Sequence, residues 1–287
     1  MSNPDGYNYQ KIAYLGIPGS YSYVAVHKYM KNKKNMTGAK SIKEVFGLVD
    51  SGKCTAGIVP LENTTTGSIY ESYDALIDTG LRITAEIILS IHHHVLGVDK
   101  GISEDNFRKV QKCLSHPQAI SQCGDFLSAH PWIKPVFTTD TASAAKEVAR
   151  CGKSDIIAIA GKEAADIYNL TILGKNIETV SHNYTRFIKV QKNMNKSEGN
   201  KISLAFSVRH VPGSLSKVLD SYAHAGLNLT KIESRPVFGR PWEYIFFLEF
   251  DIGNKGESVE NVLTEMKENT NFLTVLGRFP KGKIYET

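Results

Sequence analysis

The 287-residue sequence predicts an α/β protein that is built in two different ways along its length. In the first part, a short apolar run, a turn rich in Ser, Thr, Asn or His, and an amphipathic segment recur four times. The turns lie at residues 16–22, 60–68, 115–118 and 138–142. This recurrence is typical of alternating strands and helices in a parallel α/β architecture. Between residues 201 and 287 the order becomes βαββαβ, which predicts a ferredoxin-like domain with helices on one face of an antiparallel sheet.

The composition is that of an ordinary globular protein, with 41% hydrophobic and 22% charged residues. The net charge of +5 is mild, and the basic run Lys31–Lys34 has no interleaved aromatic residues, so we interpret it as a solvated face and predict no nucleic-acid partner. The segment Met1–Gln10 lacks the apolar core of a signal peptide, and no run reaches the ~18 apolar residues of a membrane span. Four cysteines without CxxC spacing indicate free thiols. We therefore expect a cytoplasmic protein.

The chain begins with a predicted strand at 11–15 and a predicted helix at 21–30, capped by Ser20 or Ser22. The Gly-containing turn between them could bind an anion through backbone N–H groups, although it lacks the spacing of a phosphate-binding loop. A tight turn without a ligand is the alternative interpretation.

A helix at 41–50, a strand at 56–60 and a helix at 69–77 come next. Between that strand and the second helix lie Glu62, Asn63 and Thr64, with further hydroxyls beside them. This run supplies more donors and acceptors than a turn needs, so it predicts a ligand site in preference to a structural cap.

The apolar run 83–98 contains His92, His93 and His94. On a single strand His92 and His94 would share one face. Zinc binding lacks a third ligand with suitable spacing, so we expect a hydrogen-bonding role for one histidine and no metal site.

A second group of elements follows. Strands are expected at 110–114, 136–138 and 155–160, and helices at 119–128, 143–150 and 161–168. With crossings near Val95 and Leu173, these elements predict two lobes, one of about 10–95 plus 173–191 and the other of about 96–172. The lobes would enclose a cleft for a small anion held by N–H and hydroxyl donors.

The run Ser181–Phe187 leads into a predicted strand at 187–190 and brings Asn183, Thr185 and Arg186 to its mouth. Alone, this run reads as a turn with a solvated charge. Because the other hydroxyl-rich strand ends should converge on the same cleft, Thr185 becomes the best candidate for a catalytic group.

A polar linker is predicted at 192–200. Beyond it we expect strands at 202–208, 227–234, 244–251 and 272–276, a helix that starts at 212–214, and a helix at 259–267. The predicted domains are therefore residues 1–191 and 201–287.

The hydroxyl-rich turns resemble, in order and spacing, the motifs of the prephenate dehydratase family. The opening G-x-x-G-[ST/A]-[FY]-S is matched by residues 16–22, P-x-E-N-S-x-x-G by 60–67, S-H-P-Q-A-x-x-Q-C by 115–123, T-A by 141–142 and N-x-T-R-F by 183–187. In the second part, Glu233–Pro236 matches the ESRP element and 212–215 the G-A-L element of the ACT regulatory domain usually fused to this enzyme. The chain departs from the pattern at Thr64, Thr179 and Ser214.

This resemblance implies a two-lobed, periplasmic-binding-protein-like catalytic domain and an ACT domain. The implied reaction converts prephenate to phenylpyruvate in phenylalanine biosynthesis by decarboxylation and dehydration, without a cofactor. Thr185 would contact the leaving hydroxyl, with Glu62 or a water as the proton source. The implied substrate-binding residues are Ser20, Asn63, Thr64, Ser115, Thr141, Asn183, Arg186 and Phe187. Arg186 could equally pair with a neighbouring side chain and fix the loop.

In the ACT domain, the resemblance implies feedback inhibition by phenylalanine and a homodimer or homotetramer. Its effector residues would be Gly213, Ser214, Leu215, Asn228, Glu233, Ser234, Arg235 and Pro236. Several details are closer to the plant arogenate dehydratases, so arogenate is the alternative substrate. A non-catalytic sensor is the alternative from another class. No helical segment precedes Lys11, which argues against a chorismate mutase fusion.

Overall fold

The computed structural model describes residues 11–30, 35–98, 104–192, 199–237, 239–253 and 256–287. The predicted run Lys31–Lys34, the segment Met1–Gln10 and most of the predicted linker 192–200 lie outside these ranges. The chain forms two compact units. The first contains Met1–Ser72, Ile87–Ile188 and Lys283–Thr287, and the second contains Tyr73–Glu86 and Lys189–Gly282. The domain limits given by the sequence stay a prediction.

One lobe of the first unit is built on a sheet with the order β2-β1-β3-β11-β5. These strands are Met36–Ala39, Ile12–Leu15, Ala56–Asn63, Tyr184–Gln191 and Arg82–Ser90, and the last two also contribute residues to the second unit. β1 pairs in parallel with both neighbours. Two short strands extend this lobe, with β4 (Gly67–Ser68) beside β3 and β16 (Lys283–Tyr285) beside β5.

Helices α1 (Tyr21–Tyr29), α2 (Ile42–Asp50) and α3 (Tyr70–Thr79) follow strands of this sheet. The local sequence explains α2 well. The Ser41 hydroxyl accepts a hydrogen bond from the Glu44 N–H at 3.1 Å, which caps the helix start. The predicted stripe of Ile42, Val45, Phe46 and Val49 is buried, so the expected helix is confirmed.

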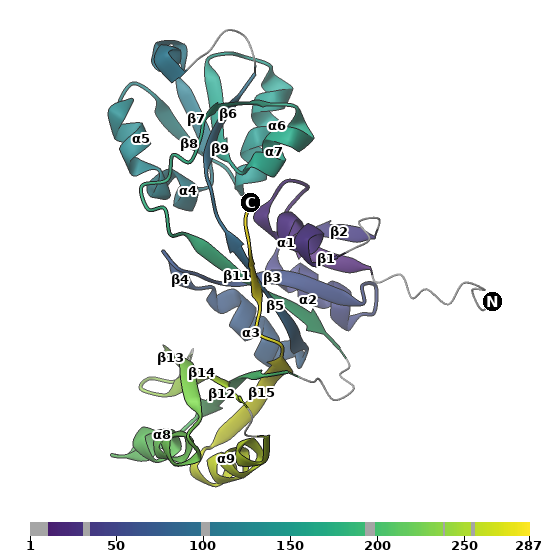
Figure 1. The fold of residues 1–287 in the computed structure, drawn as a ribbon, viewed down its shortest axis with the longest axis vertical. Coiled ribbons are helices and arrows are strands. Elements are labelled where there is room, and N and C mark those ends of the chain that lie inside the picture. Colours follow the sequence, from purple (N-terminus) through teal and green to yellow (C-terminus); the bar gives the residue numbers. More distant parts are fainter. Residues whose placement is uncertain (1–10, 31–34, 99–103, 193–198, 238, 254–255) are drawn as a thin grey trace, which may run out of the picture. The chain divides into compact units, whose positions relative to one another are not determined.

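The second lobe of this unit has a sheet with the order β10-β6-β9-β7-β8, formed by Thr171–Gly174, His94–Gly97, Ile156–Ala160, Lys112–Ser115 and Lys134–Phe137. β7 lies parallel to both β9 and β8. In Figure 1, α4 (Pro117–Gln122) and α5 (Gly124–Ala129) lie on one side of this sheet, and α6 (Thr141–Cys151) and α7 (Lys162–Tyr168) on the other. Two separate apolar clusters, one on each face, match this arrangement. A short 3-10 helix, η1 (Glu104–Lys109), precedes β7.

The chain joins the lobes through two segments, Ile91–His93 and residues 175–183. The apolar run 83–98 is therefore not one strand, because it stops at Ser90 and resumes at His94. The expectation that His92 and His94 share a strand face is wrong for this reason. His92 and His93 therefore lie in the joining segment and His94 lies directly beside it, and all three side chains form hydrogen bonds there.

The second unit contains β12 (Lys201–Ser207), α8 (Ser214–Ala225), β13 (Asn228–Pro236), β14 (Tyr244–Asp251), α9 (Gly256–Asn269) and β15 (Phe272–Phe279). This is the order expected from the sequence, with an antiparallel sheet β13-β14-β12-β15. Apolar residues of both helices pack with β12 and β14 in one core. The α/β fold class is confirmed. No helix among the described residues is long and apolar enough to span a membrane.

Candidate functional site

A cavity of about 230 Å³ lies in the first unit, between the ends of strands from both lobes. Its lining residues are Leu15, Gly16, Ser20, Tyr21, Ser22, Pro60, Asn63, Ile69, Ile91, His93, Thr185 and Phe187 from one lobe, and His116, Gln118, Ala119, Gln122, Thr139, Asp140 and Thr141 from the other. The predicted convergence of hydroxyl-rich turns therefore occurs at this cavity.

Two helix N-termini face this cavity. Ser20 caps α1 by accepting the Tyr23 N–H at 3.3 Å, and Asp140 caps α6 by accepting the Ser143 N–H at 2.8 Å. Backbone N–H groups at such ends carry partial positive charge and favour carboxylates. None of the described lining residues is Lys or Arg. The cavity thus offers neutral donors and helix dipoles to an anion.

Asn63 holds the strand ends of one lobe together and is only 5% exposed. Its amide oxygen accepts the backbone N–H groups of Thr65 and Thr66 at 3.0 and 3.2 Å, which orients the side chain. Its amide nitrogen donates to Asn183 Oδ1 at 2.7 Å and to Thr185 Oγ1 at 2.9 Å. Both ends of this amide are engaged, so Asn63 fixes Thr185 within the lining.

Thr185 lies on β11, which begins at Tyr184 and not at Phe187 as the sequence predicted. Alternate residues of a strand point to opposite faces, and Thr185 and Phe187 both line the cavity. The Asn63 amide nitrogen can only donate, so the Thr185 oxygen accepts in that bond. The hydroxyl hydrogen of Thr185 is not used there and can be donated to a ligand.

Glu62 and Arg186 occupy the alternate positions on β3 and β11 and do not line the cavity. Arg186 Nη2 donates to Glu62 Oε2 at 2.8 Å, and the two side chains are 11% and 34% exposed. The structure therefore brings the two together as an ion pair.

Three other predicted binding residues also lie outside the lining. Thr64 accepts the Tyr184 N–H at 2.9 Å and donates to His182 O at 3.2 Å. Ser115 is fully buried and donates to Ile159 O at 2.6 Å. Asn183 donates to Gln122 Oε1 at 3.1 Å. Each side chain has protein partners that hold neighbouring segments. Ser20, Asn63, Thr141, Thr185 and Phe187 are the predicted residues that the cavity brings together.

Tyr21, His93 and Gln122 line the cavity, although the sequence did not predict them as site residues. His93 Nε2 lies 2.8 Å from Gln122 Oε1, and His93 Nδ1 lies 3.1 Å from the Tyr21 hydroxyl, which also donates to His92 O at 2.7 Å. The signal that could have found Gln122 was the Gln118–Gln122 spacing, which places both side chains on one helical face.

Burial sets the protonation states of Tyr21 and His93, which form one wall of the cavity together with Gln122. Burial lowers the pKa of His93 despite the raising effect of its hydrogen bond with Gln122. Burial also raises the pKa of Tyr21 well above its usual value. A neutral imidazole with hydrogen on Nε2 donates to Gln122. The single hydrogen of the protonated phenol is then shared between His92 O at 2.7 Å and His93 Nδ1 at 3.1 Å. Both groups are therefore uncharged near neutral pH.

A pH dependence of stability follows from three histidines, because burial lowers the pKa values of His93, His94 and His116. In the unfolded chain a histidine has a pKa of about 6.5. Below that value the unfolded chain binds protons that the folded chain does not, so the free energy of unfolding decreases as pH falls. We expect the melting temperature to be constant above about pH 6.5 and to fall between about pH 6.5 and 5.

Calorimetric melting at a series of pH values measures this effect. His94→Asn should flatten the curve, because it removes one of the three histidines whose pKa values are lowered. The Asn oxygen can still accept the Asn176 N–H that His94 Nδ1 accepts at 3.1 Å, so the local structure is kept. A melting temperature that does not change from pH 7.5 to 5 would contradict the assignment of these neutral histidines.

Within the described residues, no group of three His, Cys, Asp or Glu side chains could hold a metal ion. The absence of a cofactor stays a prediction.

A second cavity, of about 900 Å³, lies in the second unit. Gly213, Ser214 and Leu215 of the predicted effector set line it. The other five, Asn228, Glu233, Ser234, Arg235 and Pro236, lie on β13 and do not line it. Arg235 forms an ion pair with Asp74, and Glu233 pairs with Lys231 at 3.0 Å.

The sequence is similar to those of known proteins along most of its length. A prephenate dehydratase from Methanocaldococcus jannaschii is 36% identical over 271 residues, which cover 91% of this chain and 95% of that protein. The "Arogenate dehydratase/prephenate dehydratase 1, chloroplastic" of Arabidopsis thaliana is 33% identical, over 96% of this chain and 73% of that one.

Two solved structures are similar along most of this chain. The quorum quenching acylase GqqA superposes with a TM-score of 0.83 and 25% identity, over 95% of this chain and 98% of that one. Prephenate dehydratase from Arthrobacter aurescens in complex with L-Phe has a TM-score of 0.82 at 24% identity, over 94% and 90%, which shows the shared fold. The sequence model of prephenate dehydratases matches residues 12–195. Because this match covers more than half of the sequence and the M. jannaschii enzyme aligns along most of it, the chain belongs to the prephenate dehydratase family.

Proposed function

We propose that the cavity binds prephenate and converts it to phenylpyruvate, carbon dioxide and water. The observation that carries this proposal is the Thr185 hydroxyl, whose oxygen accepts from Asn63 and whose hydrogen can be donated into the cavity. In this reaction the ring C–C bond to the carboxylate and the C–O bond to the 4-hydroxyl both break. The electron pair of the C–C bond completes the aromatic ring, and the departing hydroxide takes up one proton.

Such a reaction needs a donor at the departing hydroxyl and a fixed orientation of two carboxylates. Thr185 supplies the donor, and the N-termini of α1 and α6 suit the carboxylates. A Lys or Arg beside the ring carboxylate would stabilise the charge that must leave as carbon dioxide, and the described lining contains neither. The lining thus suits the transition state better than the bound substrate.

The proton source is solvent water in this proposal. Glu62 was the other hypothesis, but its carboxylate pairs with Arg186 away from the lining. We propose that this ion pair holds β3 and β11 in register and so keeps Asn63 next to Thr185.

Arogenate is the second candidate substrate, and Asp140 favours it. Arogenate carries an ammonium in place of the keto group, and Asp140 brings a carboxylate to the lining. Both carboxylate oxygens already accept from Ser143, with its N–H at 2.8 Å and its hydroxyl at 2.7 Å. These bonds offset the advantage for an ammonium, so prephenate stays the first choice.

We further propose that residues 201–287 form an ACT domain, that phenylalanine binds there and inhibits the enzyme, and that the protein is a cytoplasmic homodimer or homotetramer. The large cavity beside Gly213 and Ser214 supports an effector site. A ligand can inhibit in this way if it binds one state of the enzyme more tightly than the other.

The test measures product formation by the purified protein with prephenate and, separately, with arogenate. We expect the higher kcat/KM with prephenate, and a loss of rate when phenylalanine is added. A folded protein that forms no product from either substrate would exclude the enzyme and favour a non-catalytic sensor. An unchanged rate at saturating phenylalanine would exclude the regulation alone.

A further inference from the structure

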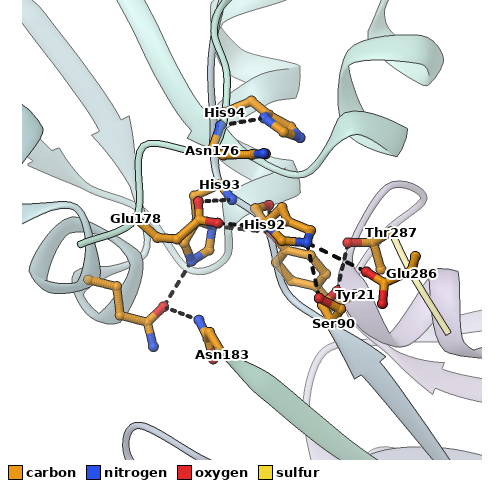
Figure 2. Close-up of polar contacts among 11 residues, drawn as sticks. Tyr21, Ser90, His92, His93, His94, Asn176, Glu178, Asn183, Glu286 and Thr287 are labelled. Atoms are coloured by element: carbon orange, nitrogen blue, oxygen red, sulfur yellow. Dashed lines mark hydrogen bonds and ion pairs between the residues drawn. The ribbon is translucent and has the colours of Figure 1, made fainter. Parts of the chain in front are cut away.

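The His92 ring lies in the joint between the lobes, just outside the cavity lining. Its Nδ1 is 2.8 Å from Glu178 Oε1, and its Nε2 is 3.0 Å from the Ser90 hydroxyl. A second carboxylate, that of Glu286, lies 3.7 Å from Nε2. Figure 2 shows the ring between groups from three separate chain segments. The side chain is 23% exposed, so it is well enclosed for a polar group.

Glu178 connects this ring to the cavity wall. Its side chain is 3% exposed, and its second oxygen accepts the His93 backbone N–H at 2.9 Å. Burial acts to raise the pKa of this carboxyl, but the hydrogen bonds from His92 and from the His93 N–H together lower it. Glu178 is therefore a carboxylate that binds the ring of one histidine and the backbone of the next.

On its Nε2 side, His92 lies next to residues that are far away in the sequence. β16 pairs in parallel with β5, with Tyr285 opposite Leu89. Thr287 Oγ1 then donates to Ser90 O at 2.7 Å, and Lys28 Nζ donates to Glu286 O at 2.6 Å. Residues 286 and 287 are thus held against the end of β5, next to the joining segment that contains His92.

The groups fixed by His92 are groups of the cavity wall. The His92 carbonyl accepts from the Tyr21 hydroxyl, and the next residue, His93, reaches Gln122. Gln122 accepts from Asn183, whose own oxygen accepts from Asn63, the partner of Thr185. His93 and Asn183 thus both bond to Gln122 Oε1. A rotation of the joint at His92 would therefore move a continuous polar network that ends at Thr185.

We propose that His92 is a positioning residue for the reaction: by donating from Nδ1 to Glu178 it holds His93 and the Tyr21–Gln122 wall in the orientation that places Thr185. This inference rests on the proposed dehydratase activity. Small displacements of aligned groups lower turnover more than binding, because alignment matters most in the transition state.

Two amide replacements separate the functions of the two ring nitrogens. In His92→Asn the amide nitrogen can replace Nδ1 and keep the bond to Glu178. In His92→Gln it can replace Nε2 and keep the contacts with Ser90 and Glu286. We expect His92→Ala and His92→Gln to lower kcat about tenfold with little change in KM, and His92→Asn to stay within about twofold of the wild type. The matched control is His94→Asn, which retains an acceptor for Asn176 and should keep wild-type kcat.

A wild-type kcat in His92→Ala, or equal losses in the Asn and Ala variants, would overturn the proposal. Nitrogen NMR of the histidine rings gives a second readout that needs no substrate. We expect the His93 ring signals to shift in His92→Ala and to remain in place in His92→Asn. Unmoved signals in the Ala variant would also overturn it. An inactive wild type with the expected NMR shifts would instead reject the proposed function and retain the positioning of His93.

Discussion

Replacing Thr185 with Ala should lower kcat for prephenate by about 10²- to 10⁴-fold and change KM by less than about threefold. The hydroxyl lies in the cavity lining, and Asn63 orients it from behind with a 2.9 Å hydrogen bond. The bond to the departing oxygen becomes stronger as negative charge develops there, so its loss affects the transition state more than the bound substrate. Steady-state kinetics with the purified variant measure both constants.

Two further variants sharpen this test. Thr185→Ser retains a hydroxyl and should keep a kcat within about tenfold of the wild type, whereas Thr185→Val retains the shape without the hydroxyl and should behave like the Ala variant. Thr171→Ala, at an exposed position of β10, is the matched control for loss of a strand threonine. A Val variant as active as the Ser variant would mean that Thr185 acts through its shape alone.

The sequence predicted best those elements that local chemistry determines. The helix α2 is an example, because it was expected at 41–50 and is observed at Ile42–Asp50, where the Ser41 hydroxyl caps it by accepting the Glu44 N–H. The strand β14 was predicted with its observed limits, since Tyr244–Asp251 is a nearly continuous apolar run. Caps and apolar stripes are visible in any window of the sequence, and no distant partner is needed to recognise them.

The start of β11 could not be read in this way. Residues 184–186 are polar, so the sequence indicated a loop that ends at Phe187. In the structure they are strand residues because β3 supplies partners for them, with Asn63 bound to Thr185 and Glu62 to Arg186. These partners are more than a hundred residues away in the sequence, and a local pattern carries no information about them.

The same reasoning applies to the polar wall around His93. The sequence indicated that one of the three histidines forms hydrogen bonds, which is confirmed, but it gave no means of choosing among them. The choice depends on where the strand stops. Ser90 ends β5, and this break directs His93 toward Tyr21 and Gln122, while His92 meets Glu178.

Replacing Asn63 with Asp should reduce kcat about as much as the loss of the Thr185 hydroxyl, by about 10²-fold or more. The substitution keeps the size of the side chain but turns its donor into an acceptor. The new oxygen would face Asn183 Oδ1 at 2.7 Å and Thr185 Oγ1 at 2.9 Å. Thr185 would then donate its hydrogen to the carboxylate, and that hydrogen would no longer be available to the substrate.

The substitution also affects stability. Two acceptors would face each other at a site that is 5% exposed, and the charge would be poorly hydrated there. We expect the free energy of unfolding to decrease by about 2 kcal/mol, measured by urea denaturation. Asn169→Asp provides the matched control, because Asn169 is an exposed residue with positive φ after α7, and Asp tolerates that conformation.

A double variant decides whether the loss of activity passes through Thr185. If the introduced carboxylate acts by capturing the Thr185 hydrogen, then adding Thr185→Ala to Asn63→Asp should lower kcat little further, so the two effects are strongly non-additive. Asn63→Ala gives the comparison, since it removes the orienting donor without providing a new acceptor, and it should retain more activity than the Asp variant at a similar loss of stability. Additive effects in the double variant would show that Asn63 and Thr185 contribute independently, and that the direction of their hydrogen bond does not control the reaction.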